Sequence, residues 1–395
     1  MIRKALLLKL FQAAYMQRWN DKLRPVDIYE LDKQAHKMII AYFVGKFEEN
    51  RKGFSWLEVI EGGTFELLQR IVLTDLKPPI LYRIKQDADK YRQLNEWVCA
   101  QLEPYIRPFN SDLWQRFRTY LCDAEDSLNR RVLTAAHFYA TSWEFGILER
   151  ANPRGYEMHE IRRSLDTQQE KYYDLTGIQQ LALRAKHRRF VDLCGELRFQ
   201  IRWSHIHRVP KTSVMGHQLL VAIISYLLSL YLAACPRRLI NNYFTGLFHD
   251  LAEVMTKDIS SPLKGAVPGL GGLIAEIESE LMETEVYALL PKKWHSQVKL
   301  FTQREFTDVV TVNGKRQEVT SQEIVDCYND DCYEPRDGTL VKAADDLAAF
   351  IETCAGIDNG SASPELAEAK LQIRDKYRGI RIGRLDLSAV YADFT

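Results

Sequence analysis

The sequence lacks an excess of charge of either sign. Its 395 residues include 53 lysines and arginines and 53 aspartates and glutamates, so the formal net charge at pH 7 is zero. A protein that coats DNA or RNA nonspecifically normally carries a basic excess that neutralises phosphates, and this balance argues against such a role. A composition of 46% hydrophobic and 27% charged residues is typical of a folded globular chain rather than a disordered one.

The sequence also lacks a cysteine framework and a phosphate-binding P-loop. It has seven cysteines, an odd number, and no CxxC pair, which does not fit a complete set of disulfides. We recognise no signal peptide at the N-terminus. These observations predict free thiols and a cytoplasmic location. The glycine-rich stretch 265–272 has no GK[ST] after it, so it does not match a P-loop.

Long uncharged runs are scarce, with one exception between Leu219 and Cys235 (LLVAIISYLLSLYLAAC). This run is slightly shorter than the roughly 20 residues that a membrane-spanning helix needs. We interpret it as a helix buried on all sides within a helical domain, with membrane contact as the alternative.

Most of the remaining sequence shows the apolar periodicity of helices, with prolines and glycines between the periodic runs. The fold class is therefore predicted to be all-α. One segment differs, because Asp308 to Val319 alternates β-branched residues around Asn313-Gly314. That dipeptide favours a two-residue primed turn and predicts a small hairpin.

At roughly 150 residues per domain, the length predicts two or three domains.

Several motifs recur in the same order about 180 residues apart, as expected of an internal duplication. An Arg-Trp pair at 18–19 precedes a helix with His36, and an Arg-Trp pair at 202–203 precedes a helix with His217. The further matches are Glu66 to Pro79 with His249 to Pro262, Asp75 with Asp258, and His137 with Asp345. The pattern predicts two domains, 1–180 and 181–395.

The sharpest chemical signal is the doublet His249-Asp250, which Glu253 follows at helical spacing on the same face. An imidazole beside a carboxylate suits a divalent metal ion, although a surface pair or a helix cap is the simpler alternative for a doublet alone. His217 begins the buried helix, where an imidazole without a partner is costly. Asp345-Asp346 lies in the apolar stretch LVKAADDLAAFIE.

The order His, His-Asp, distant Asp resembles the HD-domain superfamily of metal-dependent phosphohydrolases. The blocks RW, HQLLVA, HDLAEVMTKDISSPLK and LVKAADDLAAF resemble its bacterial 5′-deoxyribonucleotidase branch, over roughly Leu197 to Gly356. The resemblance implies one divalent metal ion held by His217, His249, Asp250 and Asp345. It also implies catalytic roles for Glu253 and Asp250, and substrate contacts from Arg202, Trp203 and Asp258. Mixed nitrogen and oxygen ligands suit Mn, Co, Fe, Zn or Mg and do not choose between them.

We therefore expect two HD-like helical domains, with the small β-hairpin near 308–319 in the second. The expected function is removal of phosphate from a nucleotide, with a (deoxy)nucleoside 5′-monophosphate as the first candidate substrate. The alternatives are another nucleotide, such as a dNTP or an alarmone, and a non-catalytic nucleotide-binding regulatory module. Retention of Glu253 argues against the regulatory module, since a pure binder needs no acid or base. Neither a nucleic-acid polymer nor a membrane is an expected partner.

In the first half, His36 is predicted at the position of the first His, and His137 at that of the last Asp. Glu66-Leu67 replaces His-Asp, and Arg70 replaces the glutamate. Leucine cannot ligate a metal, so this half is predicted to be a degenerate, non-catalytic HD-like domain. Its expected roles are packing, formation of a homodimer, or sensing of a ligand.

Overall fold

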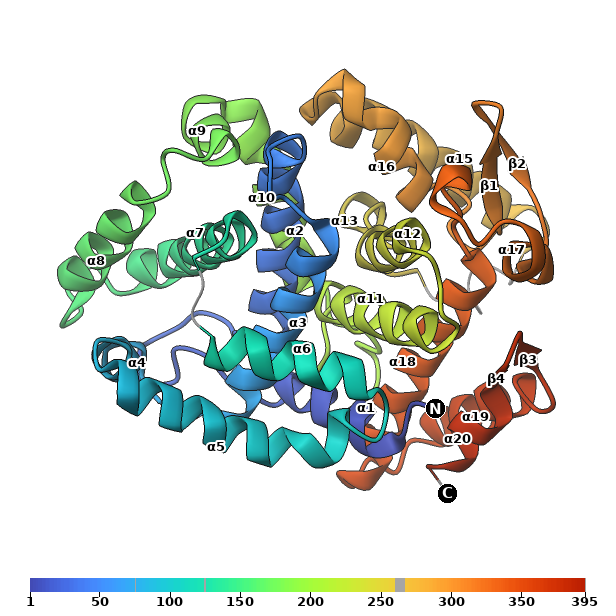
Figure 1. The fold of residues 1–395 in the computed structure, drawn as a ribbon, viewed down its shortest axis with the longest axis horizontal. Coiled ribbons are helices and arrows are strands. Elements are labelled where there is room, and N and C mark those ends of the chain that lie inside the picture. Colours follow the sequence, from blue (N-terminus) through green and yellow to red (C-terminus); the bar gives the residue numbers. More distant parts are fainter. Residues whose placement is uncertain (75, 124–125, 260–266, 395) are drawn as a thin grey trace.

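The computed structural model of the chain describes residues 1–74, 76–123, 126–259 and 267–394. It is 68% helical, and helices make up nearly all of the molecule in Figure 1. The two hairpins among the described residues are small, so the all-α prediction is confirmed.

The helices of the first half are α1 (Lys4–Phe11), α2 (Glu30–Glu48), α3 (Trp56–Val72), α4 (Pro78–Lys85), α5 (Ala88–Ile106), α6 (Ser111–Cys122), α7 (Leu128–Ala151), α8 (Met158–Glu170) and α9 (Thr176–Leu183). Those that follow are α10 (Ala185–Glu196), α11 (Val214–Tyr231), α12 (Pro236–Phe248), α13 (Glu253–Thr256), α15 (Leu270–Leu281), α16 (His295–Thr302), α17 (Ser321–Cys327), α18 (Gly338–Asp358), α19 (Pro364–Lys376) and α20 (Leu387–Ala392).

The uncharged run forms most of α11, at the centre of the fold (Figure 1). Ser213 caps its start, because its hydroxyl accepts a hydrogen bond from the Gly216 backbone N–H at 2.9 Å. Within the described part of the chain, α11 is the one helix long and apolar enough to cross a membrane. However, 89% of it is buried inside the protein, where it packs against α2, α12 and α18. It is therefore a core helix, as the sequence interpretation holds.

The predicted hairpin is present as β1 (Val309–Val312) and β2 (Lys315–Glu318), paired antiparallel with Val312 opposite Lys315. Asn313 and Gly314 between them have φ angles of 51° and 73°. Positive values at both central positions define the primed turn that the dipeptide favours. A second, shorter hairpin of β3 (Arg381–Ile382) and β4 (Leu385–Asp386) was not predicted, because strands of two residues carry no readable alternation.

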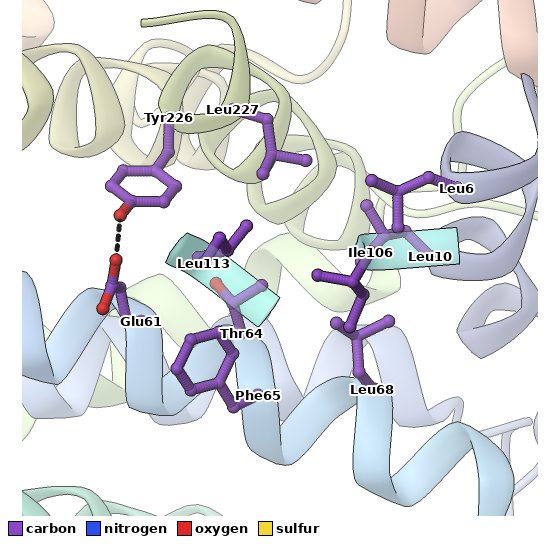
Figure 2. A pocket seen from close by; sticks show the side chains of 10 residues that line it. All are labelled: Leu6, Leu10, Glu61, Thr64, Phe65, Leu68, Ile106, Leu113, Tyr226 and Leu227. Atoms are coloured by element: carbon purple, nitrogen blue, oxygen red, sulfur yellow. Dashed lines mark hydrogen bonds between the residues drawn. The ribbon is translucent and has the colours of Figure 1, made fainter. Parts of the chain in front are cut away.

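The two halves of the chain share one hydrophobic core. Buried apolar residues of α2, α3, α11, α12 and α18 belong to a single cluster. Polar contacts cross between the halves as well. Ser213 Oγ donates a hydrogen bond of 2.6 Å to Asp32 Oδ1 of α2. Tyr226 of α11 donates one to Glu61 of α3, beside a narrow, largely apolar pocket (Figure 2). The first turns of α2 and α11 are thus held directly against each other.

Candidate active site

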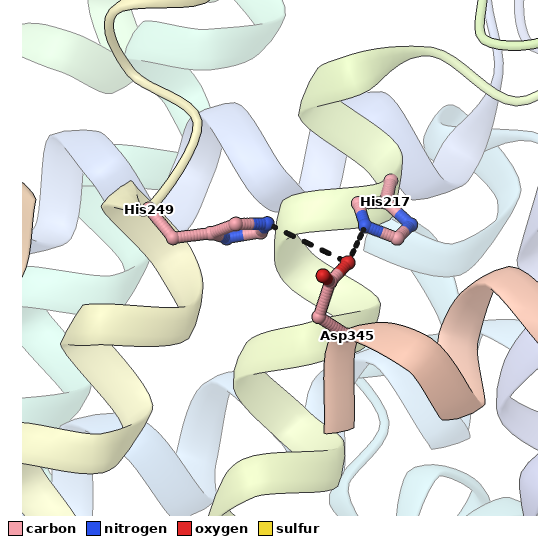
Figure 3. A group of neighbouring side chains, drawn as sticks. All are labelled: His217, His249 and Asp345. Carbon is pink, nitrogen blue, oxygen red and sulfur yellow. Dashed lines mark hydrogen bonds and ion pairs between the residues drawn. The ribbon is translucent and has the colours of Figure 1, made fainter. Parts of the chain in front are cut away.

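Three of the predicted metal ligands converge from three helices (Figure 3). His217 lies in the first turn of α11, His249 directly follows α12, and Asp345 lies in α18. One ligand atom from each lies within 4.8 Å of the other two. His217 Nε2 is 2.9 Å from Asp345 Oδ1, and His249 Nε2 is 3.9 Å from the same oxygen. Residues far apart in the sequence therefore meet at one point.

Both imidazoles are fixed through their other nitrogen. His249 Nδ1 donates to the Gly246 carbonyl at 2.9 Å, and His217 Nδ1 faces Glu352 Oε1 at 3.3 Å. With the proton on Nδ1, each Nε2 would offer its lone pair to a bound metal ion, as metal-binding histidines do. His249 Nε2 is buried and makes no hydrogen bond of good geometry to a described residue. Two such nitrogens beside a carboxylate fit a divalent ion of borderline hardness.

Asp250, the fourth predicted ligand, borders the group through His249. Its Oδ2 lies 3.0 Å from His249 Nε2, and its side chain is 21% exposed. Burial alone would lower the pKa of His249, but the charges of Asp250 and Asp345 raise that pKa to about 9. Burial would raise the pKa of Asp345, yet the hydrogen bond from His217 and the charge of Lys342 hold it well below the ordinary value. The site therefore favours positive charge at its centre.

Arg202 lies at the edge of this group. Its Nη1 is 3.9 Å from Asp250 Oδ2 and 4.0 Å from Asp258 Oδ2, and its Nε is 3.4 Å from Glu352 Oε2. Burial opposes the charge of Arg202, but Glu352, Asp250 and Asp258 raise its pKa above the ordinary value, so it stays charged.

Trp203, next to Arg202, has a φ of 56°, a left-handed conformation that is unfavourable for a bulky residue. Its indole N–H donates to Glu352 Oε2 at 2.8 Å. Strain of this kind persists only where the surroundings impose it, and it is common at functional sites.

The remaining predicted residues also lie in this region of the chain. Glu253 is buried at the first position of α13, and Gln200 donates to its backbone carbonyl at 2.8 Å. Asp258 has a side chain that is 28% exposed, which places it where the cluster opens to solvent. The structure thus brings all of the predicted residues into one region.

Sequence reasoning missed two members of the site. Glu352 is fully buried and accepts hydrogen bonds from Trp203 and, at 2.9 Å, from the Thr212 hydroxyl. Lys342 donates to Asp345 Oδ2 at 2.7 Å. The signal for Glu352 was available, since it follows Asp345 by two helical turns on the same face of an apolar helix.

The first half requires a correction. His36 does not lie beside His137, because its Nε2 bonds to the Val191 carbonyl at 3.0 Å and its ring packs on Trp143. Instead, Lys33 Nζ lies 2.6 Å from His137 Nδ1. His36 and His137 therefore do not make the contact that His217 and Asp345 make in the second half. Asp75, paired by sequence with Asp258, lies outside the described residues.

Comparison with known proteins agrees with this geometry. The HD domain family matches residues 194–374. A 5′-deoxynucleotidase of Pasteurella multocida is 22% identical over 194 residues, covering 46% of this chain and 82% of that protein. A 5′-deoxynucleotidase of Photobacterium profundum is 24% identical over 178 residues, covering 44% and 75% respectively. Residues 194–374 therefore match the HD domain family, and the comparisons support an HD-family phosphohydrolase related to 5′-deoxynucleotidases.

Proposed function

We propose that the protein removes the phosphate group from a (deoxy)nucleoside 5′-monophosphate in a metal-dependent hydrolysis. The observation that carries the proposal is the group His217, His249 and Asp345, with ligand atoms within 4.8 Å of one another and Arg202 at its edge. The names of the two relatives supply the substrate class.

His217, His249, Asp250 and Asp345 would hold one divalent ion, of which Mn, Co, Fe, Zn and Mg all suit the ligands. When bound, such an ion neutralises phosphoryl oxygens and makes water a better nucleophile at neutral pH. The protein's contribution is to hold both imidazoles through their Nδ1 contacts to Gly246 and Glu352, so that both Nε2 atoms are aimed at one point.

Arg202 would bind the substrate phosphate, since its planar guanidinium matches two phosphate oxygens. The contact from Glu352 orients its Nε and leaves Nη1 facing Asp250 and Asp258. Trp203 and the more exposed Asp258 would contact the nucleoside. Glu253 and Asp250 carry the proposed catalytic roles, with Glu253 exchanging a proton with the attacking water.

The test is phosphate release by the full chain, with each of the five metals in turn, from deoxynucleoside and nucleoside monophosphates, dNTPs and an alarmone. We expect release to be fastest from monophosphates. Asp250→Ala should lose both turnover and bound metal while its circular dichroism spectrum is unchanged. Faster release from a dNTP or an alarmone would overturn the substrate assignment. No release from any nucleotide would contradict the phosphatase function and favour a non-catalytic nucleotide-binding module.

We further propose that residues 1–180 form a degenerate, non-catalytic HD-like domain and residues 181–395 the catalytic one, in the cytoplasm. Seven free cysteines support the reducing compartment. Support for the degenerate domain comes from the first half itself, where Lys33 contacts His137 and Lys37 pairs with Glu66 at 2.8 Å. Lys37 is a cation in this ion pair and would repel a metal ion.

A further inference from the structure

The two halves share a local backbone motif around their Arg-Trp pairs. An isolated antiparallel bridge joins Gln17 to Tyr29 in the first half, and another joins Ile201 to Ser213 in the second. The bridged residues are equally far apart in both. In each half the Arg-Trp pair directly follows the first bridged residue, and Trp19 has a φ of 55° against 56° for its counterpart. The motif therefore supplies a residue-by-residue alignment of the halves.

The side-chain contacts of the two tryptophans agree with that alignment. The Trp19 indole N–H donates to Glu144 Oε2 at 3.1 Å, as the second tryptophan donates to Glu352. Arg18 Nε also bonds to Glu144, at 2.9 Å. Glu144 in α7 thus occupies the place that Glu352 has in α18.

This alignment identifies the counterparts of two metal ligands. Helices α2 and α11 each begin one residue after the bridge, and their fourth residues are Lys33 and His217. His137 precedes Glu144 by the same number of residues as Asp345 precedes Glu352. Lys33 contacts His137 at 2.6 Å, where His217 contacts Asp345 at 2.9 Å. A lysine amine therefore stands at the position of a metal-binding imidazole.

Positive charge exceeds negative charge around Lys33. The three nearby carboxylates are already engaged by other groups. Glu144 is bound by Arg18 and Arg198, Glu30 by Arg18, Gln34 and Arg70, and Glu66 by Lys37 and Tyr120. Lys33 is 0% exposed, and no carboxylate oxygen of a described residue lies within 4.0 Å of its Nζ. A buried ammonium is costly without a close counter-charge, so Lys33 needs an additional anion in the cluster to carry its charge.

We propose that Lys33, Arg18 and Arg70 form a second anion site, which takes a phosphate group without a metal. The choice of phosphate rests on the proposed function, in which Arg202, the counterpart of Arg18, binds phosphate. Arg70 and Glu66 have side chains that are 25% and 26% exposed, so solvent reaches the cluster. Burial lowers the pKa of Lys33 well below its usual range, and a bound dianion would restore the charged form. The phosphate comes either from a nucleotide or from the inorganic product.

Calorimetric titration of the full chain carrying Asp250→Ala tests this site, because that background prevents turnover. The probes are inorganic phosphate and deoxyadenosine 5′-monophosphate. Adding Lys33→Met should weaken binding of at least one probe by at least about tenfold, the usual effect of losing a charged hydrogen bond. Tighter binding of the nucleotide would identify it as the ligand, and equal binding would assign the phosphate group alone.

Lys46→Met is the matched control, since Lys46 lies on the same helix α2 and pairs with Glu49 away from the cluster; it should not change binding. Arg70→Gln, at a partly exposed position, should also weaken binding. It tests the site if the Lys33→Met variant does not fold. Binding that is unaffected by both substitutions, or no Lys33-dependent binding at all, overturns the proposal. If the chain shows no turnover, the proposed function is wrong, but the binding measurement still tests the anion site. The two proposals can therefore be refuted independently.

Discussion

At the scale of single residues, Glu352 controls the geometry of the site. It accepts from the Trp203 indole at 2.8 Å and the Thr212 hydroxyl at 2.9 Å, and it faces Nδ1 of His217 at 3.3 Å. Burial opposes its ionisation, but Arg202, His217 and Arg208 hold the pKa of Glu352 below the ordinary value. One charged carboxylate therefore positions both a proposed metal ligand and the proposed phosphate contact.

Glu352→Gln should consequently lower kcat/KM and metal affinity by roughly 10- to 100-fold, the usual effect of losing a partner behind a metal ligand. Activity assays and metal analysis of the purified variant measure the two effects. Glu365→Gln is the control, because Glu365 has a side chain that is 63% exposed and pairs only loosely with His205. A variant with normal metal content and normal kcat/KM would contradict the positioning role.

Glu253 tests the proposed acid or base at the same scale. Glu253→Gln keeps the shape of the side chain but removes its proton chemistry, so turnover should fall by roughly 10²- to 10⁴-fold while metal content stays unchanged. Glu280→Gln, on the exposed face of α15, should leave the rate unaltered. Full turnover by the Glu253 variant would show that the water needs no protein base.

At the scale of elements, the contact between α2 and α11 makes stability depend on pH. Asp32 is buried, and burial raises its pKa from 3.8 to about 6 despite the hydrogen bond from Ser213. The folded protein therefore holds a proton that the unfolded chain has released. Folding stability should fall as pH rises from about 4 to about 6, and the cost should persist above that range.

Asp32→Asn removes this titration. The free energy of unfolding of the variant relative to the native chain should rise across that window by up to roughly 3 kcal/mol and then level off. Urea unfolding of both proteins between pH 4 and pH 7 measures the difference. A difference that is constant with pH would show that Asp32 ionises normally.

Elements set by local sequence were the predictable ones. The hairpin followed from Asn313-Gly314, whose φ angles are both positive, and α11 followed from its uncharged run. His217 and Asp345 were found as polar residues in apolar helices and His249 as part of a His-Asp doublet, and the resemblance to the HD superfamily joined them into one site. The correspondence of Lys33 with His217 was not predictable. Several polar residues lie close together in α2, and only tertiary contacts show which of them takes the position of His217. The contact of Glu352 with Trp203 was not predictable either, because the two residues are distant in the sequence.

At the scale of the whole molecule, the halves are joined by a common core, although each is proposed to be an HD-like unit. A fragment of residues 181–395 would expose the surface of α11 that packs on α2. It should therefore aggregate or lack a cooperative thermal transition, as exposed core surfaces do. Size-exclusion chromatography and calorimetry of the fragment test this. A monomeric fragment with full phosphatase activity would show that the first half is dispensable.

The paired helices α2 and α11 also carry an evolutionary consequence. In a dimer of identical chains, any mutation changes both sites at once, so a substitution that destroys a metal ligand is eliminated by selection. On the proposed duplication, the two units are encoded separately yet still pack together through the Asp32–Ser213 hydrogen bond. Selection then maintains turnover in one copy while the other is free to change, and a lysine at position 33 can replace a histidine without loss of the enzyme.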